Sequence, residues 1–427
     1  MKIYKYPEEK DWAELQKRPE MDVSVLFGTV RSVFDDVRAN GDKAVIKYEE
    51  KFDGVHLETL QTTEEEFSEA EEQLSEELKA AVVAAKKNIE AFHSAQRFSE
   101  IKVETMPGVT CWQRAVAIEK VGLYIPGGTA PLFSTVLMLA VPARIAGCKE
   151  TVICTPPYGK NGKIHPAVLY AAQVSGINKV YKAGGIQAIA AMACGTETIP
   201  KTYKIFGPGN QYVMAAKQFV GIGEVAIDMP AGPSEIAIIA DANANPKFIA
   251  ADFLSQAEHG ADSQSVLLTT SETLADDVEK EIAIQTEKLL RRELTEKSLS
   301  HSRIIVMNSE DEIIRFTNDY APEHLIVQTE NYRELSKKIV NAGSVFLGAF
   351  TPESAGDYAS GTNHTLPTKG YAKMYSGVNL DSFIKKITYQ EITRNGLDAI
   401  GHTIEVMAAN EHLDAHRNAV AVRLENK

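Results

Sequence analysis

Gln256 and His259 are the first residues whose types and spacing could bind a metal ion. They lie three positions apart in a segment that Asn245 and Pro246 mark as a helix, with proline at the first helical position. Residues three apart share one helix face, so an amide oxygen and an imidazole nitrogen can reach the same ion. The alternative is a surface glutamine beside a histidine that the helix dipole favours at a helix end. Spacing alone leaves both interpretations open.

Glu323 and His324 form an adjacent acid and imidazole. Pro322 ends the helix expected before them and an apolar strand begins at Leu325, so both lie where a loop enters a strand. Neighbouring side chains can serve one site there, whereas inside a regular strand they would point to opposite faces. A carboxylate beside an imidazole suits stepwise proton transfer near neutral pH. A charged turn facing solvent is the alternative.

Asp357 and His364 lie on either side of a short stretch of small residues that includes Gly361. Glycine and small residues let the backbone approach a ligand closely, so both are candidate metal or substrate contacts. An isolated aspartate before a turn is otherwise structural.

The chain ends with a predicted helix that carries Glu411, His412 and His416. His412 and His416 are four apart, the spacing that zinc sites on helices use. Glu411 and His416 are five apart and share a face less well. The alternative is a polar helix surface.

Indications of a nucleotide or of a nucleophilic thiol are weaker. No G-x-G-x-x-G motif occurs, but Gly207–Asn210 opens a helix after a strand and could present backbone N–H groups to phosphate. Tight packing also explains such glycines. Cys154 ends a probable strand, at the edge where α/β enzymes place their sites, which would suit a thiol-dependent aldehyde dehydrogenase. A small buried hydrophobic residue is the other interpretation of Cys154.

The sequence regions that position these residues show two different patterns. Residues 1–110 are acidic and helical in pattern, with a capping box predicted at Thr62 and Glu65 and a helix start at Ser75. From about residue 118, short β-branched segments alternate with turns and alanine-rich helices, which predicts parallel strands with crossover helices. The strands expected in this part are 121–125, 151–154, 179–182, 204–206, 235–240, 266–269, 304–307, 325–327 and 345–347.

Composition bounds the class of protein. The chain has 427 residues, whereas a single domain typically has roughly 150, so two or more folded units are expected. A formal net charge of -13 argues against a nucleic-acid partner, which needs a basic surface. Four cysteines show no C-x-x-C spacing, no signal peptide is visible, and the apolar runs are too short for a membrane span, so a reducing cytoplasm is expected.

Taken together, the motifs resemble those of the histidinol dehydrogenase family. The resemblance extends from about residue 20 to the final helix and is far more specific than any single motif. A longer polar connection at 158–163 is the main departure, and a surface loop is expected there. The motifs are Leu123–Gly128, Phe206–Val213, Ala231–Glu235, Gln256–His259, Ala321–His324 and Ser360–His364.

The resemblance implies oxidation of L-histidinol through L-histidinal to L-histidine, with two NAD consumed and one Zn²⁺ per subunit. It implies a cytoplasmic homodimer whose partner subunit supplies one zinc ligand, with no nucleic acid or membrane partner. The implied residues are, for zinc, Gln256, His259, Asp357 and His416; for catalysis, Glu323 and His324; for substrate, Ser234, Gln256, His259, His324, Asp357, Glu411 and His416; for NAD, Tyr124, Gln187 and Asn210. His364 receives no role.

The implied fold is α/β, with two incomplete Rossmann-like, doubly wound domains and small, mainly helical terminal domains. The expected division is an N-terminal arm at 1–22, a discontinuous first α/β domain at 23–118 and 234–380, a second, NAD-binding α/β domain at 119–233, and a helical domain for dimer contacts at 381–427. A non-catalytic metal or nucleotide-binding protein is the alternative of a different class.

A site of Zn²⁺, one carboxylate, one amide and two neutral imidazoles has a net charge of plus one. Such a site can hold the imidazole and amine nitrogens of histidinol, so we expect the metal to orient the substrate rather than to generate hydroxide. His324 is then the base for both oxidations, and Glu323 activates the water that attacks the aldehyde.

Overall fold

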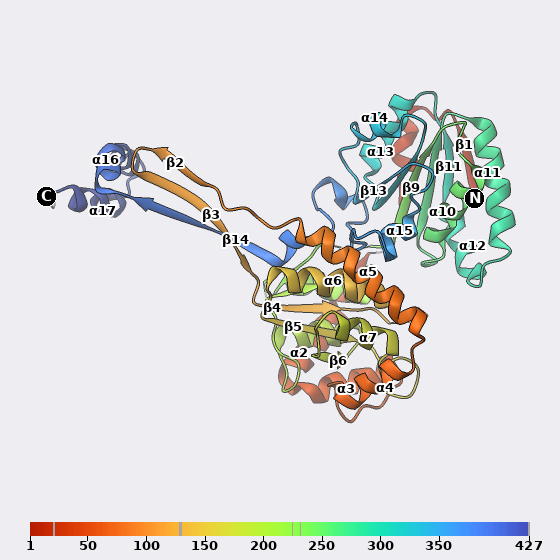
Figure 1. Cartoon of the computed structure of the whole chain (residues 1–427), viewed down its shortest axis with the longest axis horizontal. Helices are drawn as coiled ribbons and strands as arrows, with labels where there is room; N and C mark the ends of the chain where they lie inside the picture. The colour runs from red at the N-terminus through yellow and green to blue at the C-terminus, as the bar shows by residue number, and fades with distance from the viewer. Residues whose placement is uncertain (20–21, 128–129, 224, 231, 426–427) are drawn as a thin grey trace.

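The computed structural model describes residues 1–19, 22–127, 130–223, 225–230 and 232–425. Two units, each built on a parallel sheet, lie side by side, and a long arm projects away from them (Figure 1). The expected α/β class with two parallel-sheet units is confirmed. No helix in the described ranges is long and apolar enough to cross a membrane.

A five-stranded parallel sheet, ordered β6-β5-β4-β7-β8, forms the core of the first unit. Helices cover both of its faces, which is why its strands are apolar rather than alternating. The strand–turn–helix repeats expected between 121 and 220 are therefore confirmed. Its elements are β4 (Lys120–Tyr124), α6 (Phe133–Ala146), β5 (Glu150–Thr155), α7 (Pro166–Val174), β6 (Val180–Lys182), α8 (Gly185–Cys194), β7 (Lys204–Phe206), α9 (Gln211–Gly221) and β8 (Ala226–Ile227).

A six-stranded parallel sheet, ordered β1-β11-β10-β9-β12-β13, forms the second unit. Its edge strand β1 comes from the N-terminal segment, where Trp12 and Leu15 also enter the core, so the expected arm at 1–22 is part of this unit. The elements are β1 (Lys2–Lys5), α1 (Trp12–Leu15), β9 (Glu235–Ala240), α10 (Pro246–Ala257), β10 (Gln264–Thr269), α11 (Glu272–Thr286), α12 (Arg292–His301), β11 (Arg303–Val306), α13 (Glu310–Tyr320), β12 (His324–Gln328), α14 (Tyr332–Ser336), β13 (Ser344–Leu347) and α15 (Glu353–Tyr358).

The helices between residues 27 and 94 pack on the five-stranded unit, which corrects the expected grouping of 23–118 with 234–380. Helix α2 contacts α8 and α9, α4 contacts α7, and α5 contacts α6. Periodicity showed which face of each helix is apolar, but not which neighbour covers it. The Ser75 helix start is confirmed, whereas the capping box is one residue later than predicted, at Thr63 and Glu66. These helices are α2 (Phe27–Asn40), α3 (Asp42–Phe52), α4 (Glu64–Glu72) and α5 (Glu76–Ser94).

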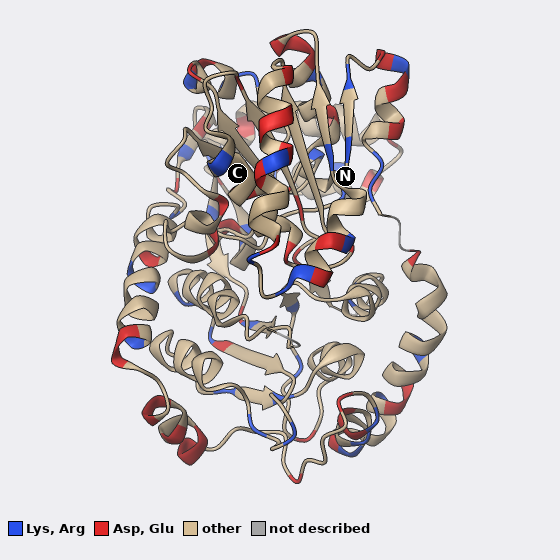
Figure 2. Cartoon of the chain, turned by 90° about the vertical axis from the view of Figure 1, so that its right-hand side faces the viewer, with Lys and Arg blue, Asp and Glu red and all other residues tan. Residues whose placement is uncertain are grey.

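The arm combines residues from both ends of the chain. A three-stranded antiparallel sheet joins two strands near residue 110 with one from the C-terminal part, so the tail from 381 is not purely helical as expected. The arm consists of β2 (Lys102–Met106), β3 (Val109–Ala117), β14 (Ile384–Ile392), α16 (Arg394–Asn410) and α17 (Asp414–Glu425). The short 3-10 helices of the chain are Glu9–Asp11, Val23–Leu26, Tyr371–Lys373 and Leu380–Phe383. Acidic and basic side chains are interspersed over the outer helices (Figure 2).

Candidate active site

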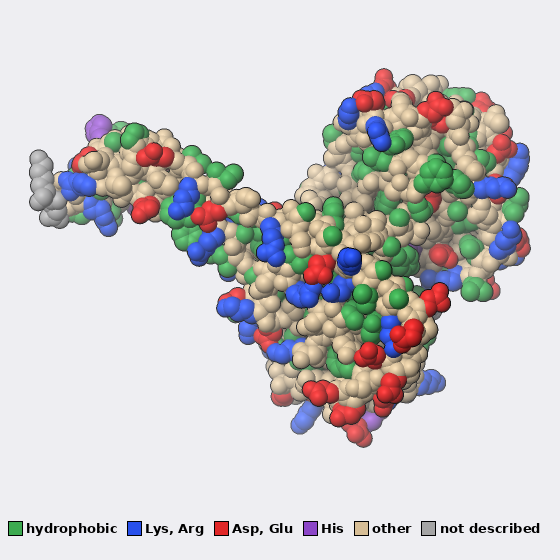
Figure 3. Space-filling model, viewed as in Figure 1, with side chains coloured by type: hydrophobic (Ala, Val, Ile, Leu, Met, Phe, Trp, Pro, Cys, Tyr) green, Lys and Arg blue, Asp and Glu red, His purple; other side chains and the backbone are tan. Residues whose placement is uncertain are grey.

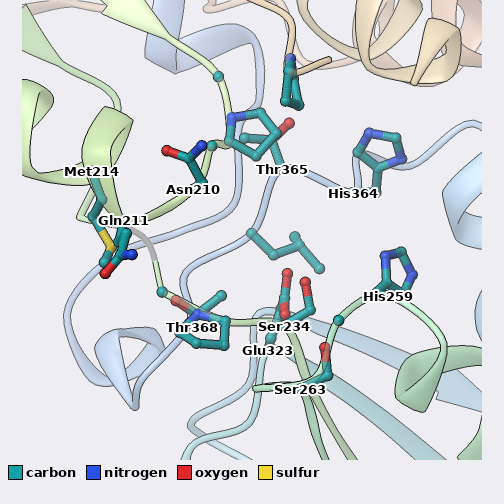
Figure 4. A pocket seen from close by; sticks show the side chains of 18 of the residues that line it. Asn210, Gln211, Met214, Ser234, His259, Ser263, Glu323, His364, Thr365 and Thr368 are labelled. Atoms are coloured by element: carbon teal, nitrogen blue, oxygen red, sulfur yellow. The ribbon is translucent and has the colours of Figure 1, made fainter. Parts of the chain in front are cut away.

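A cavity of about 390 Å³ lies between the two units and is lined by both. In Figure 4, Asn210 and Gln211 lie on one side of it, His259 and His364 on the other, and Ser234 and Glu323 lie side by side beneath. The expected site residues Ser234, Glu323, His259 and Asn210 therefore reach one cavity from segments far apart in sequence.

The two sheets meet this cavity with opposite edges. Tyr124 and Phe206 are the last residues of β4 and β7, so the five-stranded sheet presents its carboxyl ends. Glu235 and His324 are the first residues of β9 and β12, so the six-stranded sheet presents its amino ends. Helix α9 consequently begins at the cavity and α10 ends there. A helix start favours anions and a helix end favours cations.

Gln256, His259 and Asp357 form a group suited to a cation. Gln256 is fully buried, and neither atom of its amide has a hydrogen-bond partner among the described residues. The buried Oδ1 of Asp357 likewise has no partner in the described part of the chain. Buried polar atoms are normally satisfied, so these orphaned polar atoms favour a bound cation as their partner. The donor set of amide, imidazole and carboxylate fits zinc.

A carboxylate that the sequence analysis missed lies close to this group. Ligand atoms of His259, Glu353 and Asp357 all lie within 4.8 Å of one another. Glu353 and Asp357 are four apart on α15, so the spacing rule applied elsewhere in the chain would have found the pair. Burial lowers the pKa of His259, which keeps its imidazole neutral and able to bind a metal.

His324 is surrounded by carboxylates. Its Nδ1 lies 3.4 Å from Glu353 Oε1 and 3.8 Å from Glu323 Oε2, and its Nε2 lies 3.6 Å from Asp357 Oδ1. Burial lowers the pKa of His324, but the negative charges of Glu353, Glu323 and Asp357 outweigh burial and raise it to about 10. Burial raises the pKa of Glu323 to about 8. Both pKa values lie above 7, so each group tends to hold a proton at neutral pH.

Glu323 is held at the cavity by the neighbouring strand. Its Oε2 accepts a hydrogen bond of 3.0 Å from the backbone N–H of Glu235, the first residue of β9. The side chain of Glu235 is itself paired with Arg18 from the N-terminal segment. The Glu323 carboxylate is thus held by a hydrogen bond from the first residue of β9, while His324 is the first residue of β12.

His364 connects the two units at the rim of the metal group. Its Nδ1 lies 3.0 Å from the backbone oxygen of Asp357, and its Nε2 lies 3.1 Å from Thr135 Oγ1 on α6. A carbonyl can only accept, so Nδ1 donates and Nε2 accepts from the threonine hydroxyl. Burial lowers the pKa of His364, in agreement with a neutral ring. His364 is thus held in one orientation behind Asp357.

The Gly207–Asn210 turn lines the wall of the cavity that belongs to the five-stranded unit. Asn210 is exposed and caps α9 by accepting from the N–H groups of Tyr212 and Val213. Gly207 has φ +127°, and a Cβ there would lie 2.1 Å from the backbone oxygen of Tyr124, so only glycine fits. Lys217 donates to the backbone oxygen of Gly207 at 2.7 Å and fixes the turn.

Tyr124 and Gln187, the other two residues expected to contact NAD, are buried. The hydroxyl of Tyr124 accepts from the backbone N–H of Gly185 at 3.1 Å. The amide of Gln187 donates to Glu49 at 2.7 Å, and Gln187 is fully buried. The two residues lie at the carboxyl end of the sheet but, unlike Asn210, do not line the cavity.

Glu411 and His416 are not near the metal group of their own chain. Both are exposed at the far end of the arm, whereas α10 and α15 lie in the six-stranded unit at the other end of the molecule (Figure 1). Their expected neighbours are therefore not within one subunit. His412 lies beside them with φ +58°.

Cys154 lies within the hydrophobic core of the five-stranded unit and is fully buried. Burial raises the pKa of its thiol, so the thiolate needed for nucleophilic attack is disfavoured. The packing favours the interpretation of Cys154 as a small core residue.

Comparison with known proteins agrees with this arrangement. The family model described as histidinol dehydrogenase matches residues 16–424. The histidinol dehydrogenase of Bacteroides thetaiotaomicron is 66% identical over 424 residues, covering 99% of each chain, and that of Escherichia coli K12 is 50% identical over 414 residues, covering 96% of this chain and 94% of the relative. A crystal structure of histidinol dehydrogenase from Elizabethkingia anophelis superposes with a TM-score of 0.98 at 53% identity, covering 100% of this chain and 98% of that one. The chain therefore belongs to the histidinol dehydrogenase family of oxidoreductases.

Proposed function

We propose that this protein oxidises L-histidinol through L-histidinal to L-histidine with NAD in a zinc-dependent reaction of histidine biosynthesis in the cytoplasm. The observation that carries the proposal is the position of Asp357, whose Oδ1 is orphaned among the described residues, beside His324 of the Glu323–His324 pair. Family membership supports the substrate, because the matched relatives carry the name of that activity.

The zinc ligands in this proposal are Gln256, His259 and Asp357, with the partner subunit's His416 as the fourth. One carboxylate leaves the site with a net charge of plus one, which suits neutral nitrogen ligands from the substrate. When bound, zinc supplies a positive centre that orients the substrate. The end of α10 favours a cation at this place.

Nucleotide binding is assigned to the opposite wall. The exposed Asn210 and the start of α9 suit a phosphate, because helix N-termini present free N–H groups. Tyr124 and Gln187 border the same sheet edge, and contact with the cofactor requires them to become accessible. When bound, NAD accepts the hydride in each oxidation.

The chain's own residues handle the protons. His324 accepts the proton of the alcohol at its Nε2 in the first oxidation. Glu323, whose carboxylate lines the cavity, takes a proton from the water that attacks the aldehyde. His324 then accepts the proton of the resulting hydrate in the second oxidation. Two adjacent bases allow both steps without release of the aldehyde.

A homodimer completes the site in this proposal. The distant Glu411 and His416 require a second copy to reach a metal group. The arm carries exposed apolar residues that a partner can cover (Figure 3). Ile101 is 69% exposed, Val406 46%, Met407 61% and Leu413 42%.

A stopped assay of NADH absorbance combined with metal analysis tests the proposal. We expect two NADH for each histidinol consumed, one zinc per subunit, and loss of activity on exhaustive chelation with recovery on zinc addition. Full activity without metal would contradict the zinc role. Oxidation of aldehydes but not of histidinol would support the thiol-dependent alternative, and metal binding without turnover would support the non-catalytic one.

A further inference from the structure

Glu353 is buried beside His324 and, unlike Glu323, does not line the cavity. It is 1% exposed and is absent from the residues that line the cavity, whereas Glu323 lines it. Both carboxylates approach the same nitrogen of His324, at 3.4 Å for Glu353 and 3.8 Å for Glu323. The two acids are therefore alternative partners for one nitrogen of the imidazole.

One face of α10 holds the beginning of α15 and with it Glu353. Ser255 Oγ donates to Glu353 Oε2 at 2.9 Å. The carboxylate of Asp252, one turn earlier, accepts from Gln328 Nε2 at 2.9 Å and from the backbone N–H of Glu353. The side chain and the backbone of Glu353 are thus both anchored to the helix that carries Gln256.

This anchoring leaves one oxygen of Glu353 for His324. Oε2 is occupied by Ser255, while Oε1 has no hydrogen-bond partner among the described residues. The Nδ1 of His324 is likewise buried without a partner in the described ranges. The Oε2 of Glu323 already accepts from Glu235, so Glu353 is the better acceptor for an Nδ1–H.

We propose that Glu353 is a positioning residue that accepts a hydrogen bond from Nδ1–H of His324 and thereby directs the basic Nε2 toward the substrate. The proposal rests on the proposed function, because it assigns the proton-accepting role to His324. The nitrogen that carries the proton in a histidine is set by the hydrogen bond of the other nitrogen. Ser255 acts through Glu353 by holding its second oxygen.

Glu353→Gln tests the proposal with little change in volume. We expect kcat for histidinol to fall by about 10²-fold or more, with KM within about twofold and zinc content unchanged. Ser255→Ala should lower kcat by about tenfold, since it releases the carboxylate without removing it. Ser265→Ala is the matched control: Ser265 is buried and donates to the backbone of α10 at Phe253 but does not contact Glu353.

A double-mutant cycle separates positioning from general packing. In the His324→Ala background, adding Glu353→Gln should lower the residual rate by less than about twofold. Ser255→Ala combined with Glu353→Gln should be no worse than Glu353→Gln alone. Multiplicative losses in either pair would overturn the proposal, because they would indicate independent effects.

Two further outcomes are decisive. Loss of zinc from Glu353→Gln would make Glu353 a metal ligand and overturn the positioning role. Full activity of Glu353→Gln in a protein that oxidises histidinol would overturn this inference alone, whereas an inactive wild-type protein with bound zinc would overturn the proposed function. If Glu353→Gln fails to fold, as seen by circular dichroism, the Ser255→Ala and Ser265→Ala comparison still decides.

Discussion

The two α/β units use the same kind of sheet but face the cavity with opposite edges. The five-stranded unit presents strand carboxyl ends, a glycine turn and the start of α9. The six-stranded unit presents strand amino ends, the end of α10, and a buried group of acids and imidazoles. Ligands of open α/β sheets usually bind at the carboxyl edge, so the six-stranded unit departs from that rule.

The difference follows from what each edge offers. A carboxyl edge collects helix N-termini, whose N–H groups suit phosphate without any charged side chain. An amino edge collects helix C-termini, which favour cations and tolerate a concentration of carboxylates around a metal. The five-stranded unit would thus bind its ligand through backbone groups, and the six-stranded unit would act through side chains. Mutations in the two units should therefore have different effects.

The largest effect is expected from the proposed metal ligands. It would show that the wall formed by the six-stranded unit needs a residue from a second subunit. His259→Ala and His416→Ala should each lower kcat by about 10³-fold or more, because each removes a proposed zinc ligand. After the two variants are mixed, unfolded and refolded together, activity should return to about a quarter of wild type, since half the dimers then carry one intact site of two.

The control for this experiment is each variant refolded alone, which should remain inactive. Activity that stays absent in the mixture, in dimers shown by mass spectrometry to be mixed, would contradict the assignment of His416 to the partner subunit's site.

Glu323→Gln tests whether Glu323 has a different role from the proposed zinc ligand Asp357 on the same wall of the cavity. We expect oxidation of histidinal to fall by about 10²- to 10⁴-fold and oxidation of histidinol to fall less, because only the aldehyde step needs water activation. Separate assays with each substrate measure this split. Equal losses on both substrates would contradict the role of Glu323.

The pH dependence of the aldehyde step gives a second measure of Glu323. Its pKa is raised to about 8, so the carboxylate that acts as base predominates only above that pH. In the wild-type protein, kcat/KM for histidinal should rise with pH through about 8. The rise should be missing in Glu323→Gln, and a profile already flat from mildly acidic pH in the wild type would contradict this assignment.

Gly207→Ala probes the backbone wall. The added Cβ would lie 2.1 Å from the backbone oxygen of Tyr124 at a φ of +127°, so the turn must move. We expect a loss of about 1–3 kcal/mol in the free energy of unfolding and a raised KM for NAD, with zinc content unchanged. Chemical denaturation and steady-state kinetics measure these quantities. Gly223→Ala is the control, because nothing lies within 4 Å of a Cβ there.

Cys154→Ser should have the smallest effect on turnover. The thiol is buried in the five-stranded core, and the replacement introduces a hydroxyl there, so a small loss of stability is expected while kcat stays within about twofold of wild type. Steady-state kinetics at saturating substrate measure this. A loss of kcat comparable to that of Glu323→Gln would support the thiol-dependent mechanism instead.

Local chemistry alone determined much of this protein. Alternating β-branched strands, turns and alanine-rich helices identify two parallel α/β units, because periodicity records which faces are buried. Asn245 and Pro246 do start the helix that carries Gln256, and Pro322 does precede the strand that begins at His324, since caps and prolines act within a few residues. The spacing of the candidate metal and acid–base residues was readable for the same reason.

Only the tertiary structure decided what those elements face. The packing of residues 27–94 on the five-stranded unit and the strand β14 in the arm depend on partners far away in the sequence. The spacing of Glu353 and Asp357 is readable from sequence, but the contact of Glu353 with His324 appears only once α15 lies against α10. The use of opposite sheet edges also arises from the packing of the two units against each other. Local sequence patterns do not encode that long-range packing.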